Sequence, residues 1–210
     1  MLAFCGITPF LFNGLVNSVI YQNAALYWGF ELLTWIVIPG VVLYLVIRTP
    51  GVRFADLGYH MSIRNYHGPV PLLFACVLFA PLCYGIYAGS YTFFRGLLPD
   101  TGFFDYDSIV PDSGFLYFVV VVYFGLSAGL VEEFLFRGLL YRAFNGFRHS
   151  LPLFLVISPL LFSLVHWENG LVNLAATLVV GVFMAFAYLG LRNLWPLVVG
   201  HIFTDLTWFG

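Results

Sequence analysis

The residues of this sequence that could do chemistry stand where charged side chains are least expected, within or at the ends of apolar segments in the C-terminal half. They are Glu132, Glu133, Arg137, His166, His201 and Asp205. An ionisable side chain inside a bilayer costs roughly 2.5–3.5 kcal/mol, and pairing rarely recovers the whole cost. Because only 9% of the chain is charged, this concentration of ionisable groups predicts a shared polar cavity with a function.

The spacing of these residues indicates which of them pair on one helix. Glu133 and Arg137 are four residues apart, with the acid on the N-terminal side, which favours an ion pair. Glu132 lies about 100° around the same helix, so it needs a partner from another segment. His201 and Asp205 again share one helix face, and the aspartate could fix the tautomer and the orientation of the imidazole.

Buried carboxylates and imidazoles of this kind suit the activation of water. A glutamate paired with a histidine can deprotonate a water for attack on an amide carbonyl, and a second histidine with an aspartate can stabilise the developing oxyanion. The sequence holds no G-x-S-x-G motif, and no serine or cysteine has a convincing base beside it. We therefore expect hydrolysis by activated water rather than by a covalent nucleophile.

Membrane helices must position these residues, because the composition excludes a soluble fold. The 210 residues are 61% hydrophobic, with a mean hydropathy of +0.95, whereas soluble domains are about 45–50% apolar and about 25% charged. A spanning helix needs about 20 mainly apolar residues. The runs that meet or approach this length are 28–48, 69–91, 114–140, 151–166, 171–190 and 194–210, with 2–22 as a weaker seventh. The predicted fold is an all-α transmembrane bundle of about six to seven spans, in which 1–113 supplies N-terminal helices and 114–210 carries the chemistry.

Arginine placement predicts how the bundle is oriented, because cytoplasmic loops retain Lys and Arg. The loops expected at 49–68 and 141–150 and the turn at 191–193 hold arginines, whereas the loop at 92–113 is mainly acidic. Its acids are Asp100, Asp105, Asp107 and Asp112. Alternating the spans places every arginine-rich loop on one side and the acidic loop on the other. We expect a cytoplasmic N-terminus, if 2–22 spans, and an outward C-terminus.

Three short motifs, each expected on a membrane helix, carry a resemblance to a known family. They are E-E-x-x-x-R from Glu132 to Arg137, F-x-x-x-H from Phe162 to His166 and H-x-x-x-D from His201 to Asp205. In this order they resemble the CAAX prenyl protease and bacteriocin-processing (CPBP, or Abi) family of glutamic-type intramembrane peptidases. The resemblance covers 114–210, and the stretch from Phe54 to Gly58 also looks familial.

The roles that the resemblance implies fall into three pairs: water activation by Glu132 and His166, an oxyanion site at His201 and Asp205, and support from Glu133 and Arg137. It implies an intramembrane endopeptidase that acts on a membrane-embedded or lipid-anchored peptide or protein, without a metal or a cofactor. We expect such a multi-pass protein in the bilayer of the prokaryotic cell (inner) membrane. The net charge of −2 and the lack of a basic run give no indication of nucleic acid as a partner.

The third family motif reads H-x-x-x-N or H-x-x-x-D, and this chain has the aspartate, Asp205. Of the two residues, aspartate is the less suited to donate a hydrogen bond to an oxyanion. An ionised carboxylate has no hydrogen to donate to an oxyanion. Either Asp205 is protonated, or it serves only to orient His201. We favour the orienting role, because the neighbouring imidazole offers the carboxylate a positive partner.

Other functions are compatible with the same residues. A zinc-dependent intramembrane protease could use Glu132, His166, His201 and Asp205 as ligands, although no H-E-x-x-H motif is present. A proton-coupled carrier or channel relays protons through Glu and His, but the internal repeats usual in carriers are not visible. A non-catalytic peptide-binding or immunity protein would also keep a polar cavity. The sequence does not choose the substrate or its scissile bond.

Overall fold

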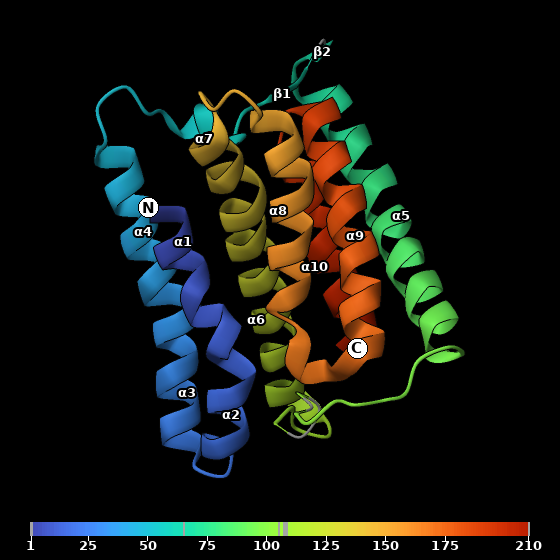
Figure 1. Ribbon diagram of the computed structural model, residues 1–210. Helices are drawn as coiled ribbons and strands as arrows, with labels where there is room; N and C mark the ends of the chain where they lie inside the picture. The colour runs from blue at the N-terminus through green and yellow to red at the C-terminus, as the bar shows by residue number, and fades with distance from the viewer. Residues whose placement is uncertain (1, 65, 105, 107–108, 210) are drawn as a thin grey trace.

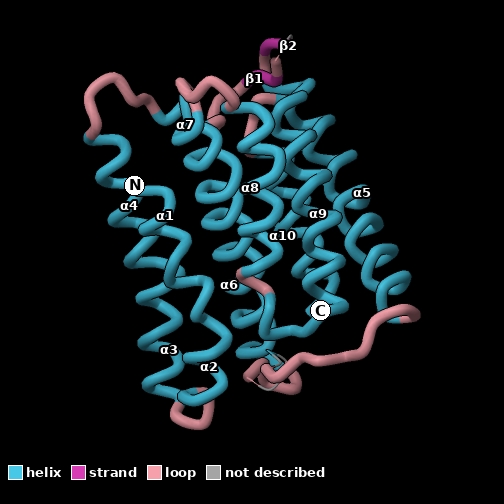
Figure 2. The backbone as a smooth tube through the Cα atoms, viewed as in Figure 1, coloured by secondary structure: helices cyan, strands magenta, loops and turns pink. Residues whose placement is uncertain are grey.

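The computed structural model shows a bundle of helices (Figures 1 and 2). The residues that it describes are 2–64, 66–104, 106 and 109–209. Asp105 and Asp107 of the acidic loop lie outside the described residues. Extended structure in the described part of the chain is limited to one short hairpin, in which β1 (Ser62–Ile63) pairs antiparallel with β2 (Tyr66–His67). The predicted all-α fold class is confirmed.

The N-terminal segment folds as a helical hairpin. Its first arm comprises α1 (Leu2–Ile7), the 3-10 helix η1 (Thr8–Phe12) and α2 (Asn13–Ile20). Its second arm comprises α3 (Ala24–Leu32), the π-helix η2 (Leu33–Val37) and α4 (Ile38–Arg48). The side chain of Asn23 caps α3 by accepting a hydrogen bond from the backbone N–H of Leu26 at 3.2 Å. Pro39, just after η2, has no backbone N–H to donate to the turn before it, which favours the widened π-helical turn.

The remaining helices follow in a simple order along the chain. They are η3 (Phe54–Leu57), α5 (Pro69–Arg95), α6 (Gly114–Glu132), the π-helix η5 (Glu133–Leu139), α7 (Leu140–Phe144), α8 (Ser150–Leu164), the 3-10 turn η6 (Trp167–Asn169), α9 (Gly170–Leu191) and α10 (Trp195–Phe209). Pro69 opens α5 and Pro196 lies in the first turn of α10, where a missing N–H removes no helical hydrogen bond.

Five segments among the described residues are long and apolar enough to cross a membrane. They are Leu2–Ile20, Ala24–Arg48, Pro69–Arg95, Gly114–Phe144 and Trp167–Leu191. Helices α8 and α10 have 15 residues each, fewer than the about 20 that a full span needs. The chain is therefore an integral multi-pass membrane protein, and its weakest predicted segment, 2–22, supplies one of the five.

The helices of the C-terminal half pack around α10. This helix contacts α5 and α6, while α9 contacts α8 and α5. In Figure 1 the N-terminal hairpin and α5 lie on opposite sides of the bundle, with α6 between them. Helix α1 contacts η5, and α6 contacts η2. The hairpin thus covers the face of the bundle at which α6 passes into η5.

The two ends of the bundle differ in charge, in agreement with the arginine pattern. At one end the backbone N–H of Arg64 donates to the carbonyl of Leu191 at 3.0 Å, and the guanidinium of Arg192 lies 4.4 Å from the centroid of the Tyr141 ring. The described residues of the acidic loop, 96–104, 106 and 109–113, lie at the other end (Figure 1). The assignment of the arginine-bearing end to the cytoplasm stays a prediction.

Asp56 belongs to the arginine-bearing end and lies far along the chain from the candidate catalytic residues. Its carboxylate accepts a hydrogen bond from the backbone N–H of Arg53 at 2.9 Å and pairs with the Arg53 guanidinium at 3.3 Å. These two hydrogen bonds, the backbone one first, lower the pKa of the Asp56 carboxyl. Asp56 therefore provides a carboxylate outside the site for comparison with those inside it.

Candidate active site

The two adjacent glutamates lie where α6 changes into a π-helix. Glu132 is the last residue of α6 and Glu133 is the first of η5. A π-helical segment inside an α-helix is rare and frequently marks a functional site. It also disturbs the backbone ladder, and here the hydroxyl of Ser158 on α8 donates to the carbonyl of Phe136 at 2.8 Å. The sequence did not predict this widened turn, which presents both carboxylates to the bundle interior.

Glu133 joins two of the predicted residues. Its Oε1 accepts a hydrogen bond from Nη1 of Arg137 at 3.0 Å and lies 2.8 Å from Nδ1 of His201. The side chains of Glu133 and Arg137 are both 0% exposed. The predicted pair of Glu133 with Arg137 is confirmed. The contact with His201 was not predicted, because it joins residues 68 positions apart in the chain.

The ring of Phe162 packs the two histidines and the arginine against one another. The Arg137 guanidinium lies 4.1 Å from its centroid, an arrangement that attracts a cation to the aromatic face. The rings of His166 and His201 have centroids 5.1 and 5.8 Å from it. The phenylalanine of the F-x-x-x-H motif is therefore a packing centre for the site.

When the His166 ring is neutral, its contact with a backbone carbonyl determines which nitrogen carries the hydrogen. Its Nδ1 lies 2.7 Å from the backbone carbonyl of Phe162, and since a carbonyl only accepts, Nδ1 carries the hydrogen. The unprotonated Nε2 then lies 4.0 Å from Oε2 of Glu132. This separation exceeds that of a direct hydrogen bond. Glu132, 3% exposed, thus lies near a histidine from another segment, but its Oε2 has no direct hydrogen-bond partner among the described residues.

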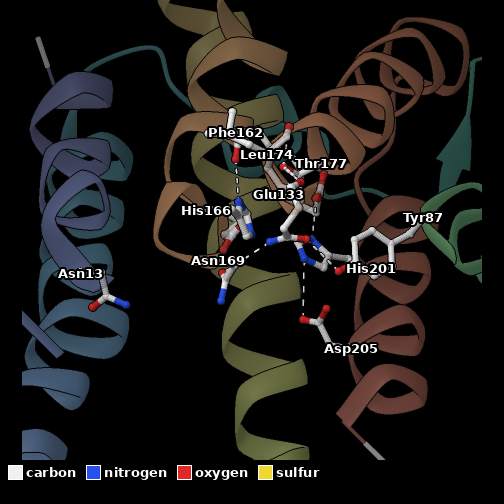
Figure 3. Close-up of polar contacts among 12 residues, drawn as sticks. Asn13, Tyr87, Glu133, Phe162, His166, Asn169, Leu174, Thr177, His201 and Asp205 are labelled. Carbon is white, nitrogen blue, oxygen red and sulfur yellow. Dashed lines mark hydrogen bonds and ion pairs between the residues drawn. The ribbon is translucent and has the colours of Figure 1, made fainter. Parts of the chain in front are cut away.

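His201 lies between two carboxylates, and they are not equivalent. Glu133 is within hydrogen-bond distance of Nδ1, whereas Oδ2 of Asp205 lies 3.7 Å from Nε2. Figure 3 shows Glu133, His201 and Asp205 pointing toward one another, with His166 close by. The predicted helical neighbour Asp205 does lie beside His201, but Glu133 is its hydrogen-bonded carboxylate.

All six predicted residues thus converge, and we call them the catalytic cluster: Glu132, Glu133, Arg137, His166, His201 and Asp205. A cavity of about 520 Å³ lies against them. The four residues predicted to be catalytic, Glu132, His166, His201 and Asp205, line this cavity. Among the described residues, Glu133 and Arg137 are not in its lining, so they lie behind the residues that a ligand would meet.

The cavity is also lined by polar residues that sequence reasoning missed. They include Asn13, Glu31, Tyr106, Glu168 and Asn173. The hydroxyl of Tyr87 on α5 donates to Oδ1 of Asn173 on α9 at 2.8 Å. Glu31 and Glu168 could have been found by the argument used for the other acids, because each is an ionisable residue in an apolar segment.

The loop after α5 closes one end of the cavity. The backbone N–H of Phe103 donates to the carbonyl of Glu168 at 2.9 Å, and Oγ1 of Thr101 accepts from the N–H of Leu171 at 3.1 Å. Gly170 has a φ of +87°, and a Cβ there would lie 2.4 Å from the backbone nitrogen of Gly102. Glycine is therefore required for the loop to approach the turn between α8 and α9 this closely.

Within the part of the chain that the structure describes, histidines, cysteines and acids do not gather in groups of three that could hold a metal ion. Within the catalytic cluster, His166 faces Glu132, and His201 lies between Glu133 and Asp205, at the distances given above.

Comparison with known families supports the resemblance read from the motifs. Residues 114–207 match the family model described as type II CAAX prenyl endopeptidase Rce1-like. The matched segment contains all three motifs, from Glu132 to Asp205. No curated protein and no solved structure matches the chain.

Proposed function

We propose that the chain, whose residues 114–207 match the family model described as type II CAAX prenyl endopeptidase Rce1-like, hydrolyses a peptide bond within the membrane, using a water activated by Glu132 and His166. The substrate would be a membrane-embedded or lipid-anchored peptide or protein. The observation that carries the proposal is the 4.0 Å gap between Oε2 of Glu132 and Nε2 of His166, two atoms on the wall of one cavity.

The gap suits a single water molecule. Hydrogen bonds from a water to a carboxylate and to an imidazole nitrogen are each about 2.8 Å long. One water that donates a hydrogen to each acceptor therefore spans the distance between Glu132 and His166. Its lone pairs then face away from both residues and into the cavity, where a carbonyl carbon can approach.

Glu132 acts as the general base in this scheme. As the water oxygen bonds to the scissile carbonyl carbon, Glu132 takes a proton from the water and the carbonyl π electrons move to the carbonyl oxygen. When the carbon–nitrogen bond breaks, the protonated Glu132 returns its proton to the leaving amine. His166, held by the carbonyl of Phe162, keeps the water oriented throughout. Atoms and charges balance without a covalent intermediate.

His201 supplies the donor for the oxyanion. If Nδ1–H donates to Glu133, a neutral ring has no hydrogen on Nε2, so only the imidazolium form can donate through Nε2. The carboxylates of Glu133 and Asp205 on either side favour that charged form. Arg137 holds Glu133 in place through their hydrogen bond of 3.0 Å. Asp205 is then a positioning residue for His201, in agreement with the role that we favoured from the sequence.

Mass spectrometry of membrane peptides tests this proposal. Membranes are compared from cells that express the wild-type chain, Glu132→Gln, or the control Asp56→Asn, which changes a carboxylate outside the site. We expect new peptide termini with the wild type and the control, and their loss with Glu132→Gln, because removing a general base lowers turnover by about 10²–10⁴-fold. The same termini in all three samples would exclude Glu132 as the base. No new termini in any sample would favour a peptide-binding protein instead.

A further inference from the structure

The cavity wall carries two buried carboxylates that the proposed chemistry does not use, one on the N-terminal hairpin and one in the turn between α8 and α9. Glu31 on α3 is 1% exposed, and Glu168 in η6 is 2% exposed. Both line the same cavity as Glu132 and His166. In each, Oε2 has no hydrogen-bond partner among the described residues. We call this pair the acidic subsite.

The described hydrogen-bond partners on the Glu168 side of the acidic subsite are neutral groups. Nδ2 of Asn13 donates to the hydroxyl of Tyr106 at 2.7 Å, and that hydroxyl donates to Oε1 of Glu168 at 3.4 Å. Burial, followed by the nearby charges of Glu168 and Glu31, raises the pKa of the Tyr106 phenol. Tyr106 is therefore an uncharged donor that uses one oxygen of Glu168 and leaves the other free.

Glu168 is held in place by its backbone and by close packing. Its carbonyl accepts the N–H of Phe103, as described above, which fixes η6 to the loop. A Cβ at Gly14 would lie 2.3 Å from Cβ of Glu168, so α2 passes the glutamate at a glycine and leaves no space between them. The position of the carboxylate is thus built by three separate segments of the chain.

The acidic subsite has no cation of its own. In the described part of the chain, neither Glu31 nor Glu168 forms an ion pair. Arg137, the buried arginine of the catalytic cluster, already donates to Glu133. A buried, ionised carboxylate without a counter-charge is strongly destabilising. A cationic group on a ligand in the cavity would supply that charge.

We propose that Glu31 and Glu168 form a subsite that binds a cationic group of the peptide substrate, either an ammonium or a guanidinium. This inference rests on the proposed function for its substrate, but the binding of the cation does not depend on cleavage. The subsite shares one cavity with the catalytic cluster, so a basic side chain seated there would fix the peptide relative to the activated water. Glu31 and Glu168 would then determine specificity for a basic residue near the scissile bond.

Thermal unfolding of the full-length protein in detergent tests the cation binding without any turnover. The probes are benzamidine, which carries a positive amidinium, and benzamide, a neutral molecule of similar shape. A ligand that binds the folded state raises the unfolding temperature as its concentration passes its dissociation constant. We expect benzamidine to raise the unfolding temperature of the wild type, Glu132→Gln and the control Asp56→Asn, with benzamide giving no comparable shift.

The glutamine variants assign the binding to the two carboxylates. Glu31→Gln and Glu168→Gln should each weaken benzamidine binding at least tenfold. If one variant does not fold, the other still tests the proposal. Equal shifts with benzamidine and benzamide would overturn the proposal. A saturable rise of the unfolding temperature with sodium chloride, but not with N-methylglucamine chloride, would also overturn the proposal. That result would indicate a site for a metal cation.

The peptides found by mass spectrometry connect the subsite to the substrate. A basic residue should recur at a fixed distance from the new termini made by the wild type, and this preference should weaken at least tenfold with Glu168→Gln while cleavage continues. Cleaved peptides without a basic residue at any fixed position would contradict the subsite and leave the proposed peptidase standing. If no peptide is cleaved while benzamidine binds, the proposed function fails and the cation site remains.

Discussion

Two groups of buried acids lie at one cavity, and they differ in whether a basic or imidazole nitrogen of the chain faces each carboxylate. In the catalytic cluster every carboxylate faces a nitrogen: Glu133 with Arg137 at 3.0 Å, Glu132 with His166 at 4.0 Å, and Asp205 with His201 at 3.7 Å. In the acidic subsite, no described residue forms an ion pair with Glu31 or Glu168. A cluster whose carboxylates all face nitrogens of the same chain can be set before the substrate arrives. A cluster whose charges are unmatched needs a group from outside.

Backbone geometry does not separate the two groups. Glu132 directly precedes the π-helix η5, and Glu31 stands two residues before the π-helix η2. Both acids are buried, and both lie on helices long enough to span the membrane. The difference is the presence of partners, since an uncompensated charge in a low-dielectric interior is strongly destabilising. The comparison can therefore be tested by removing charges one at a time.

The largest expected effect on stability comes from the matched cluster. Glu133→Gln leaves Arg137 buried without its counter-charge, and breaking a buried pair costs about 3–5 kcal/mol. We expect a loss of this size in the free energy of unfolding, measured with denaturant in detergent. The exposed pair changed by Asp56→Asn should lose less than about 1 kcal/mol. A Glu133→Gln protein that is as stable as the wild type but inactive would mean that the roles of the two adjacent glutamates are reversed.

Asp205→Asn should have a smaller effect, and on activity rather than on stability. Glu133 remains hydrogen-bonded to His201 in this variant, so the imidazole keeps its main orienting partner. We expect the turnover of a cleaved peptide to fall by less than about tenfold, which corresponds to about 1.4 kcal/mol. A loss as large as that of Glu132→Gln would instead give Asp205 a direct part in the reaction.

The unmatched acids should contribute little to stability. Glu31→Gln removes a carboxylate whose Oε2 has no partner in the described structure and replaces it with a neutral amide of the same shape, which is easier to bury. The free energy of unfolding should therefore not fall, and relief of an uncompensated buried charge should raise it. Destabilisation equal to that of Glu133→Gln would show that Glu31 already has a charged partner and would end the contrast between the two groups.

Removing metal ions should change nothing. A divalent ion held between Glu31 and Glu168 would match their charges, and zinc in the catalytic cluster would replace general-base chemistry by metal chemistry. We expect the unfolding temperature and the peptide cleavage of the purified protein to be the same with and without a chelator. Loss of either property in chelator, restored by adding one metal alone, would overturn this part of the account.

The sequence predicted what depends on a single segment. Apolar runs located the helices, and four-residue spacing on one helix found the pairs of Glu133 with Arg137 and of His201 with Asp205. The motifs also named six residues that the structure brings close together, and their catalytic roles stay a prediction. The hydrogen bond between Glu133 and His201 was not predictable, because helix packing decides which face of α6 meets α10.

Other features were missed for different physical reasons. The π-helical turn after Glu132 depends on tertiary partners such as Ser158, and local propensity does not encode it. Glu31 is a lone acid in a segment that is otherwise a good span, and Glu168 lies just after His166. Neither acid belongs to a recognisable motif, so the sequence did not single them out, although burying them costs as much as burying the acids of the catalytic cluster.

The central claim is that Glu132 and His166 hold one water between them, and a double-mutant cycle tests it most directly. The turnover of a peptide identified by mass spectrometry is measured for the wild type, Glu132→Gln, His166→Asn and the double variant. Residues that act as a unit are not additive, so each single change should lower turnover by about 10²–10⁴-fold. The double variant should then lie within about tenfold of the worse single variant. Losses that multiply would show that the two side chains act independently, and the shared water would be wrong.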